Sequence, residues 1–382
     1  MVSKTRRVAF TILIICCMFN IICYVIYVNY PVVVMTTIRH LPVVSMVNVT
    51  QRSFNRPMVN DIMDYNFALE KQTNLPNIYF GDLDDSEVDV DEEDEIIMQE
   101  GSDDDDFLMN QQDLCHKEGG YVRLIIVVTC SVDVFNKRTA IRETWGSYTK
   151  KIDMGVRVAF LTGRTLNKTF QRQLEEENDI YHDIIQGNFL DTYRNLTLKS
   201  ILLQKWIATY CSSAQYGLKA DDDMFVHVPN LLAGLRRVQY PRFFFCSLQV
   251  GASPIRNKKS KWFVPKGEFP QARYPNYCSG SAYSFSINIA ADLFSKSKET
   301  PIFWLEDIYI TGILARKVGM RHIHHKGFQF WKTTIGKPCS FKRLITSHRV
   351  SPSELRSIWK FNLNHRVIAL LDNHFIIVYT II

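Results

Sequence analysis

The sequence predicts an α/β protein whose mainly parallel sheet carries helices on its faces. Short apolar, β-branched runs alternate with helical stretches, and such runs are typical of strands that are covered on both faces. The order strand, helix, strand, helix is the one that a parallel sheet with crossover helices requires. The chain of 382 residues, 46% hydrophobic and 12% aromatic, can also bury one large core.

The first strand is expected at 121–130, because "YVRLIIVVTC" is an almost uninterrupted apolar run. The stretch 136–148 ("NKRTAIRETWGSY") predicts a helix. The run 156–163 ("VRVAFLTG") predicts a second strand, which Gly163 ends. A polar helix at 166–179 completes the first β-α-β-α unit.

The alternation continues in the next part of the chain. A third short strand is expected at 182–189. The helix predicted over 192–211 has apolar residues at helical spacing, among them Leu198 and Leu202. The chain then returns to a strand at 216–223 ("YGLKADDD"), which ends in three consecutive carboxylates.

These carboxylates, Asp221, Asp222 and Asp223, stand where ligands bind in an open α/β sheet, beyond the carboxyl end of a strand. Side chains alternate along an extended chain, so Asp221 and Asp223 share one side and Asp222 faces the other. Two converging carboxylates repel each other unless a cation neutralises them. Magnesium or manganese suits such oxygen ligands and can also hold a diphosphate. The alternatives are a solvated turn and an N-cap at Asp223 for a helix starting near Pro229.

The N-terminal segment predicts a membrane anchor. Residues 1–7 are basic, and the apolar run 8–28 carries no charge and is about as long as a bilayer-spanning helix needs to be. Bulky residues continue the run where a signal peptide would have its small-residue cleavage site, which favours an uncleaved anchor. By the positive-inside rule, we expect a cytosolic tail at 1–7 and the rest of the chain in the secretory lumen.

Six cysteines follow the anchor, and none has the C-x-x-C spacing of a zinc site or redox motif. We therefore expect an oxidised structural framework, whose connectivity the sequence leaves open. The six are Cys115, Cys130, Cys211, Cys246, Cys278 and Cys339. The triplets that begin at Asn48, Asn167 and Asn195 match the pattern of glycosylation acceptors.

The formal charge of +6 conceals a strongly acidic run at 82–106 and a basic remainder. The segment 29–113 has little periodicity and scattered prolines, which predicts a flexible luminal stem. The basic residues beyond it are dispersed and lie in the wrong compartment for a nucleic-acid partner. Diphosphate donors and anionic glycans would explain the same basicity.

Seven segments occur in an order that identifies a family. They are "KRTAIRETWG" (137–146), "FLTG" (160–163), "DIIQGNFLDTYRNLTLKS" (183–200), "KADDDMFV" (219–226), "YPNYCSGSAYSFS" (274–286), "LEDIYITG" (305–312) and "ITSHRVSPSELRSIW" (345–359). With them, the chain from about 124 to 359 resembles the β1,3-glycosyltransferases of glycosyltransferase family 31. One departure is Ala282, where the family commonly has glycine, and it bears on acceptor specificity.

The resemblance implies a GT-A fold, a Rossmann-like mainly parallel sheet with helices on both faces, as a catalytic domain at 114–362. It also implies a UDP-sugar donor, manganese dependence and inverting transfer to a hydroxyl of an acceptor glycan on a glycoprotein or glycolipid. The anchor, stem and luminal domain resemble the family's type II Golgi membrane organisation. The apolar C-terminal extension at 363–382 has no assigned role, and the oligomeric state stays open.

The resemblance also assigns roles at the reaction centre. It makes Asp221 and Asp223 the D-x-D pair of the metal site, with Asp223 the direct ligand, and His348 a further ligand. Neutral imidazole suits such a metal, and the alternative for His348 is an ordinary surface histidine. Asp307 matches the base that removes the acceptor's proton. Glu306 is the rival base, and both acids would also favour the N-terminal end of a helix over 308–317.

The donor pocket is expected from the matched segments. The residues assigned to it are Arg138, Arg142, Asp191, Lys199, Asp221 and Asp222. Arg138 and Arg142 lie four apart on a predicted helix and so share a face, for which the alternative is a solvated basic surface. The alternative for Asp191 is the N-cap of the helix that follows it.

The donor sugar is expected to be galactose, with N-acetylglucosamine or N-acetylgalactosamine as the alternative within the same enzyme class. A non-catalytic luminal lectin or chaperone on the same fold is the alternative of another class. Tyr274, Tyr283 and Trp304 are candidates for aromatic faces under a sugar, although core packing explains such residues more often.

Overall fold

The computed structural model describes residues 106–116, 121–334, 341–364, 370–372 and 375–377. The predicted tail and anchor, and the predicted stem up to residue 105, lie outside the described residues. Within the described ranges, no helix is both long and apolar enough to cross a membrane. The described residues 106–364 belong to one compact unit. In the other unit, β11 (Leu370–Asp372) and β12 (Phe375–Ile377) form an antiparallel hairpin.

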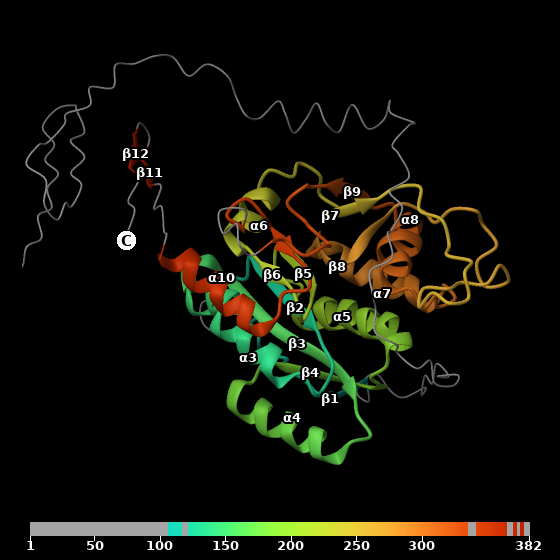
Figure 1. Ribbon diagram of the computed structural model, residues 1–382, viewed down its shortest axis with the longest axis horizontal. Coiled ribbons are helices and arrows are strands. Elements are labelled where there is room, and N and C mark those ends of the chain that lie inside the picture. The colour runs from blue at the N-terminus through green and yellow to red at the C-terminus, as the bar shows by residue number, and fades with distance from the viewer. Residues whose placement is uncertain (1–105, 117–120, 335–340, 365–369, 373–374, 378–382) are drawn as a thin grey trace, which may run out of the picture. The chain divides into compact units, whose positions relative to one another are not determined.

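The compact unit is built on an eight-stranded mixed sheet in the order β1-β4-β3-β2-β5-β8-β7-β9 (Figure 1). Its strands are β1 (Phe107–Met109), β2 (Leu124–Thr129), β3 (Val156–Arg164), β4 (Ile184–Leu190), β5 (Tyr216–Asp221), β7 (Phe243–Gln249), β8 (Tyr277–Ser286) and β9 (Arg321–His324). The neighbours β4, β3, β2 and β5 run parallel, which confirms the parallel sheet predicted for this stretch. β1 and β8 pair antiparallel to β4 and β5.

Helices cover both faces of this sheet. They are α3 (Phe135–Glu143), α4 (Lys168–Tyr181), α5 (Leu196–Tyr210), α6 (Val228–Leu235), α7 (Ala290–Lys298), α8 (Ala315–Lys317) and α10 (Pro352–Asn364). The central strand β2 is covered on both faces, which explains why its sequence is apolar without interruption. Ile125 and Val127 belong to the core cluster that α5 and α7 complete, whereas Ile126 and Val128 belong to the cluster of α3 and α10.

The ordered domain begins before the expected boundary at 114. β1 adds an edge strand to β4, and Asp106 forms a 2.7 Å ion pair with Lys205 of α5. The Asn110 side chain accepts a 2.9 Å hydrogen bond from Trp206. The predicted stem at 29–113 is therefore too long at its C-terminal end. A three-residue strand beside an acidic run is too short to leave a periodic signal.

Two disulfides are present among the described cysteines, Cys115–Cys211 and Cys246–Cys278. Cys130 is buried with a free thiol, whose pKa burial raises to about 11. The expectation that all six cysteines form a framework is therefore wrong for Cys130, while Cys339 lies outside the described residues.

The three glycosylation triplets differ in their accessibility. Asn167 is exposed and caps α4 by accepting from the backbone N–H groups of Thr169 and Phe170. Asn195 is buried, and its amide donates to the carbonyl of Leu190 at 2.9 Å. A glycan has no access to Asn195 in this fold, and Asn48 lies outside the described residues.

Candidate active site

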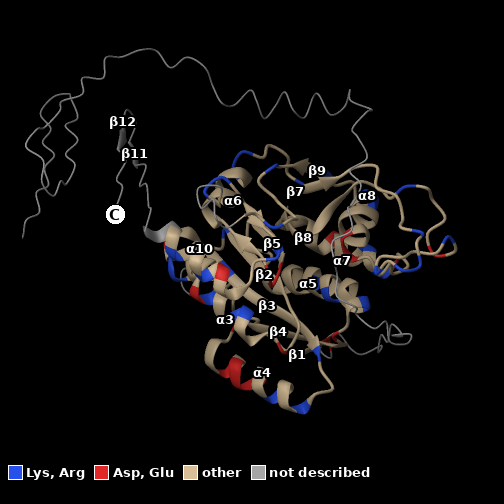
Figure 2. Cartoon of the chain, in the orientation of Figure 1, with Lys and Arg blue, Asp and Glu red and all other residues tan. Residues whose placement is uncertain are grey.

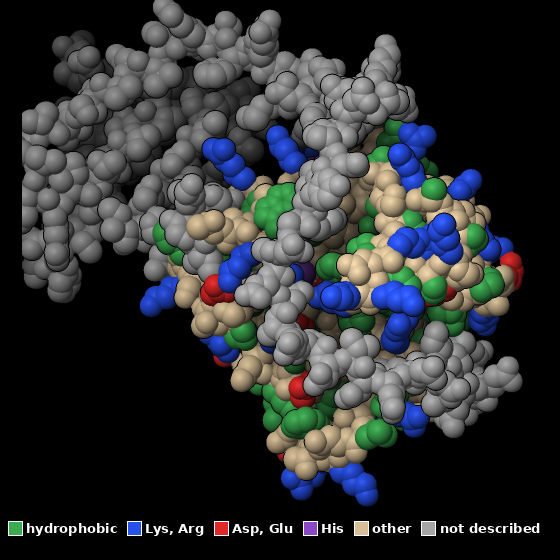
Figure 3. All heavy atoms as spheres, turned by 45° about the vertical axis from the view of Figure 1, so that its right-hand side comes forward, with side chains coloured by type: hydrophobic (Ala, Val, Ile, Leu, Met, Phe, Trp, Pro, Cys, Tyr) green, Lys and Arg blue, Asp and Glu red, His purple; other side chains and the backbone are tan. Residues whose placement is uncertain are grey.

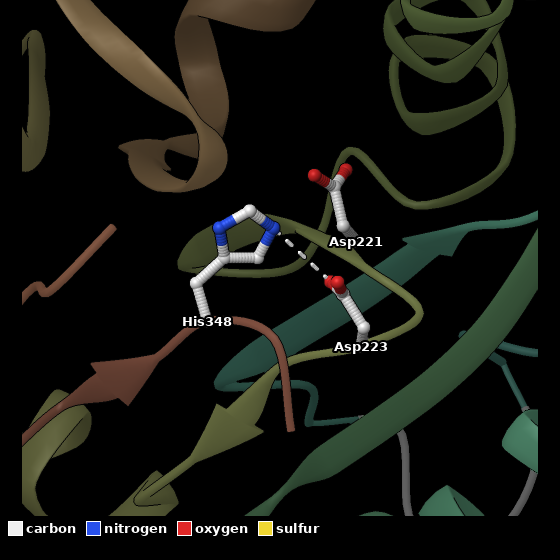
Figure 4. A group of neighbouring side chains, drawn as sticks. All are labelled: Asp221, Asp223 and His348. Atoms are coloured by element: carbon white, nitrogen blue, oxygen red, sulfur yellow. Dashed lines mark ion pairs between the residues drawn. The ribbon is translucent and has the colours of Figure 1, made fainter. Parts of the chain in front are cut away.

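Three potential metal ligands meet at the carboxyl end of β5. A short ladder between β6 (Phe225–Val226) and β10 (Thr346–Ser347) holds the segment of His348 against the turn that follows β5. Ligand atoms of Asp221, Asp223 and His348 all lie within 4.8 Å of one another. Figure 4 shows these three side chains around one space, with His348 Nε2 3.3 Å from Asp223 Oδ1.

The chemistry of this group fits a divalent cation. Asp223 Oδ1 is buried and accepts no hydrogen bond from the described residues. The Nδ1 atom of His348 lies 3.0 Å from the carbonyl oxygen of Phe330, which fixes the tautomer and leaves the Nε2 lone pair facing the carboxylates. Burial tends to raise the pKa of Asp223, but the neighbouring His348 outweighs it and the pKa is lowered. Two carboxylates and one imidazole are a ligand set for manganese and similar metals.

Asp222 is turned away from this group, as expected, although β5 ends at Asp221 and the strand predicted over 216–223 is two residues too long, because Asp222 and Asp223 lie in the turn that follows. Its carboxylate forms a 2.7 Å ion pair with Lys137 of α3. Of the two alternatives for the acidic run, the N-cap at Asp223 is wrong, whereas Asp222 and Asp223 do lie in a turn that is partly exposed to solvent. The N-cap of α6 is His227, whose ring accepts from the N–H of Asn230, and Asp223 faces His348.

A buried lysine joins this group to a second pair of acids. The Lys219 ammonium donates to Asp221 and to the carbonyl of Gly280, at 2.6 Å in the second case, and lies 4.0 Å from Glu306. Burial opposes its charge, but Asp221 and Glu306 raise its pKa above the usual value, so it stays protonated. Sequence reasoning missed Lys219. The signal was there, because Lys219 precedes Asp221 by two positions on the same strand face.

Asp307 stands at the start of the helix expected over 308–317, which is present as one continuous helical run. Its first part, Ile308–Leu314, is a π-helix, and α8 follows it directly. The Asp307 carboxylate accepts from the N–H groups of Ile308 (2.8 Å) and Gly280 (3.1 Å). Burial, and then the negative charge of Glu306, raise the pKa of Asp307 to about 7. A carboxylate of this pKa can take up a proton near neutral pH.

Glu306 has a different environment. It is buried, and its carboxylate accepts a 2.6 Å hydrogen bond from the Tyr283 hydroxyl. The Tyr283 ring is itself completely buried. Of the two adjacent acids, Glu306 is therefore the one whose carboxylate is held by a core residue. Tyr283 is that residue, and its buried ring offers no face to a sugar. Tyr274 and Trp304 are also largely buried.

The two arginines of α3 share a face, but their contacts lead to other carboxylates. Arg138 has no exposed surface, and its guanidinium contacts Glu177 at 2.7 Å. Arg142 contacts Glu177 at 2.6 Å and Asp183 at 2.7 Å. These contacts neutralise both arginines inside the α3–α4 packing. They exclude the solvated basic surface as the alternative, and they give no support to a place in the donor pocket.

Asp191 and Lys199 bind each other across the carboxyl ends of three parallel strands. Lys199 donates to Asp191 at 2.6 Å and to the carbonyl of Cys130 at 2.8 Å. Asp191 also accepts from the N–H of Gly163 at 2.9 Å, so it does not cap the helix that follows. The pair lies at the sheet edge where nucleotides bind in related folds.

Ala282 lies in the core and pairs with Ala220 across β5 and β8. Its methyl group therefore packs inside the domain. The acceptor-specificity effect expected from this departure has no support in its position.

Comparison with known proteins places this site in a family. The galactosyltransferase family model matches residues 136–326. The chain is 36% identical over 256 residues to beta-1,3-galactosyltransferase 1 of Mus musculus and of Homo sapiens, covering 66% of this chain and 77% of each relative. The chain belongs to the galactosyltransferase family. The resemblance to glycosyltransferase family 31 is thereby confirmed.

A second curated relative and a solved structure are also similar to the chain. Beta-1,3-galactosyltransferase 2 of Mus musculus is 36% identical over 261 residues, covering 66% of this chain and 61% of that protein. A glycosyltransferase involved in glycosylation of the major capsid of PBCV-1 aligns at a TM-score of 0.34 and 11% identity, covering 63% of this chain and 99% of that one. That TM-score is too low to bear on the site. Membership makes the protein a β1,3-galactosyltransferase-like hexosyltransferase, against the non-catalytic alternative.

Proposed function

We propose that this galactosyltransferase-family protein transfers galactose from UDP-galactose to a hydroxyl of an acceptor glycan, with inversion and with Mn²⁺. The observation that carries the proposal is the arrangement around Lys219. This buried cation contacts Asp221, which groups with Asp223 and His348, and it also lies 4.0 Å from Glu306, the neighbour of Asp307. A group transfer needs both a site for the leaving diphosphate and a base for the attacking hydroxyl.

On the donor side, Asp221, Asp223 and His348 would hold Mn²⁺. When bound, this ion supplies positive charge that stabilises the departing diphosphate. The protein's own part is to orient the ligands. The Phe330 carbonyl fixes the His348 ring, and Lys219 and Thr129 hold Asp221, the latter at 3.2 Å. Ligands held in advance need little reorganisation during the reaction.

On the acceptor side, Asp307 takes the proton of the attacking hydroxyl. The acceptor oxygen forms a bond to the anomeric carbon while the bond from that carbon to the diphosphate oxygen breaks, and the electron pair leaves with UDP. One direct displacement inverts the anomeric centre, so an α-linked donor gives a β linkage. The N–H groups of Ile308 and Gly280 hold the Asp307 carboxylate in place for this step.

Galactose is proposed as the donor sugar because the relatives at 36% identity are named beta-1,3-galactosyltransferases. A GT-A fold and a type II Golgi membrane orientation complete the proposal. The membrane orientation is supported by the apolar run at 8–28 and by the two disulfides, which suit an oxidising compartment.

The test is UDP release by the purified full-length protein across UDP-galactose, UDP-N-acetylglucosamine and UDP-N-acetylgalactosamine, each with Mn²⁺ or with a chelator. The acceptors are β-galactoside, N-acetylglucosamine and mannose glycosides. We expect acceptor-dependent release with UDP-galactose and Mn²⁺, and a β1,3 linkage in the product by NMR. A preference for either other donor would overturn the galactose assignment, and an α-linked product would overturn the inverting mechanism.

The membrane orientation has its own test. In sealed microsomes, a C-terminal epitope should resist added protease until detergent opens the vesicles. Digestion of the epitope in intact vesicles would contradict the type II orientation.

A further inference from the structure

A long ordered loop, residues 250–276, connects β7 to β8 and projects from the sheet (Figure 1, gold, at the right). Arg256 braces it from within, because its guanidinium donates to the carbonyls of Val264 (2.7 Å) and Phe269 (2.6 Å). Phe269 packs on Tyr274 with ring centroids 4.8 Å apart. Loops of this length that keep a fixed shape in a compact domain commonly have a function.

This loop reaches the side of the domain that holds Asp307. The Trp262 indole N–H donates a 3.0 Å hydrogen bond to the hydroxyl of Tyr193. Both aromatic rings are substantially exposed, Trp262 by 37% and Tyr193 by 52%. The Tyr193 ring centroid lies 6.4 Å from that of Trp304, which stands three positions before Asp307 in the chain. Trp262 and Tyr193 therefore lie beside the segment that carries Asp307.

The loop is strongly basic, with six lysines and arginines against the single acid Glu268. Arg256 is committed to backbone carbonyls, and the Lys261 ammonium lies 4.8 Å from the centre of the Trp262 ring. Four exposed cations form no ion pair with any residue that the structure describes: Lys258, Lys259, Lys266 and Arg273. Figure 2 shows stretches of Lys and Arg on the loop at the right of the domain, and Figure 3 shows Lys and Arg side chains gathered on this side of the domain.

The acid of the loop leaves these cations unneutralised. Burial raises the pKa of Glu268, and the nearby Arg194 acts against this rise. Arg194 itself lies over the ring of Trp304, 4.2 Å from its centre. Among the described residues Glu268 forms no ion pair with the four exposed cations, so the positive charge of the loop is not cancelled within it.

We propose that loop 250–276 binds the acceptor and selects one that carries an anionic group, a sulfate, a uronic-acid carboxylate or a phosphate. This inference rests on the proposed transfer at Asp307. The exposed cations contact the anionic group, while Trp262 and Tyr193 form the wall beside the sugar that reacts. Attraction of this kind between exposed charges is modest for each contact and weakens with salt.

The test compares acceptor disaccharides that differ only in one sulfate, one uronic acid or one phosphate. The full-length protein is assayed with UDP-galactose and Mn²⁺ at low and at high salt. We expect the KM of the matching anionic acceptor to be about 3- to 10-fold below that of its neutral counterpart at low salt, with little effect on kcat. The three anionic arms identify which group is recognised.

The variant is Lys258→Gln/Lys259→Gln, and the matched control is Lys150→Gln/Lys168→Gln, which removes the same charge from exposed positions outside the loop. The loop variant should reduce the preference for the anionic acceptor by about 3-fold or more, and the control should leave it intact. Calorimetric titration of the same disaccharides in the presence of UDP measures binding without turnover.

Equal KM and equal binding for neutral and anionic acceptors would overturn the inference and leave the transfer function standing. The inference would also be overturned if the loop variant lost its binding to vesicles of anionic phospholipid but kept its preference for the anionic acceptor. The loop would then contact a membrane surface. If no acceptor is glycosylated, the proposed function fails, and salt-sensitive binding of an anionic disaccharide that the loop variant loses would still support recognition by the loop.

Discussion

Raising the pH should activate transfer through the ionisation of Asp307. Its pKa is raised from 3.8 to about 7, first by burial and then by Glu306, and only the ionised carboxylate can accept the acceptor's proton. With a pKa of about 7, roughly a tenth of the enzyme is ionised at about pH 6 and about nine tenths at about pH 8. We therefore expect kcat/KM to rise roughly tenfold across this range and then to level off.

The Glu306→Gln variant tests the cause of this profile. The change removes the like charge and keeps an oxygen that can accept from Tyr283, so the pKa of Asp307 should fall by on the order of one unit. The rising limb then moves to lower pH. Besides Glu306, the described groups whose pKa is influenced by Asp307 are Lys219, Tyr193, Tyr274, Tyr277 and Tyr283. Their pKa values are all raised above the usual range, so they do not titrate here.

The assay is initial-rate UDP release at constant ionic strength, with saturating Mn²⁺ at every pH so that protonation of His348, the proposed ligand, does not limit the rate. Far-ultraviolet circular dichroism confirms that the protein is folded at each point. A flat profile, or a midpoint that Glu306→Gln leaves unmoved, would refute the assignment of the limb to Asp307. Complete loss of activity in Glu306→Gln with normal donor binding would make Glu306 the base instead.

Four further variants test the metal site, the core and the base. Asp223→Asn should remove Mn²⁺-dependent transfer without lowering the thermal midpoint, whereas Asp222→Asn should retain metal binding measured by calorimetry; equal metal affinity in Asp223→Asn and the wild type would remove Asp223 from the ligand set. Arg138→Met leaves Glu177 buried with one partner fewer and should cost about 3 kcal/mol in a urea unfolding titration, and a loss within error of zero would show that Arg142 suffices. Because folding raises the pKa of Asp307, the native state binds the extra proton and the wild type loses stability as pH rises from about 4 to about 7. Asp307→Asn should therefore gain thermal stability over the wild type across that interval, and a constant difference at all pH values would contradict the raised pKa.

The local sequence pattern was enough to predict the parallel half of the sheet and the grouping of Asp221 with Asp223. Each of the strands β2 to β5 is a short apolar run that more polar residues separate from the next element. The expected grouping of Asp221 with Asp223, and the separate direction of Asp222, are found in the structure. β5 nevertheless ends at Asp221, so the turn after it, and not strand alternation, places Asp222 and Asp223. The position of His348 could not be predicted from the local pattern, because the ladder between β6 and β10 holds it beside Asp223.

The partners of the buried charges could not be predicted, because they depend on contacts between distant segments. Arg138 lies on α3, but its ion-pair partner is Glu177, which α4 places against it. Lys219 reaches the Gly280 carbonyl only because β8 pairs with β5 in an antiparallel register. The same pairing brings Tyr283 under Glu306 and turns an aromatic sugar-face candidate into a core residue.

Separating donor binding from transfer in Asp307→Asn tests most directly whether the metal group and Asp307 serve one reaction. UDP-galactose binding in the presence of Mn²⁺ is measured by calorimetry, and galactose transfer by product formation, for this variant and the wild type. We predict a Kd within about twofold of the wild type and a kcat lower by about 10²- to 10⁴-fold, the usual contribution of a general base. Normal turnover in the variant would contradict the account, because the proton of the acceptor would then have another destination.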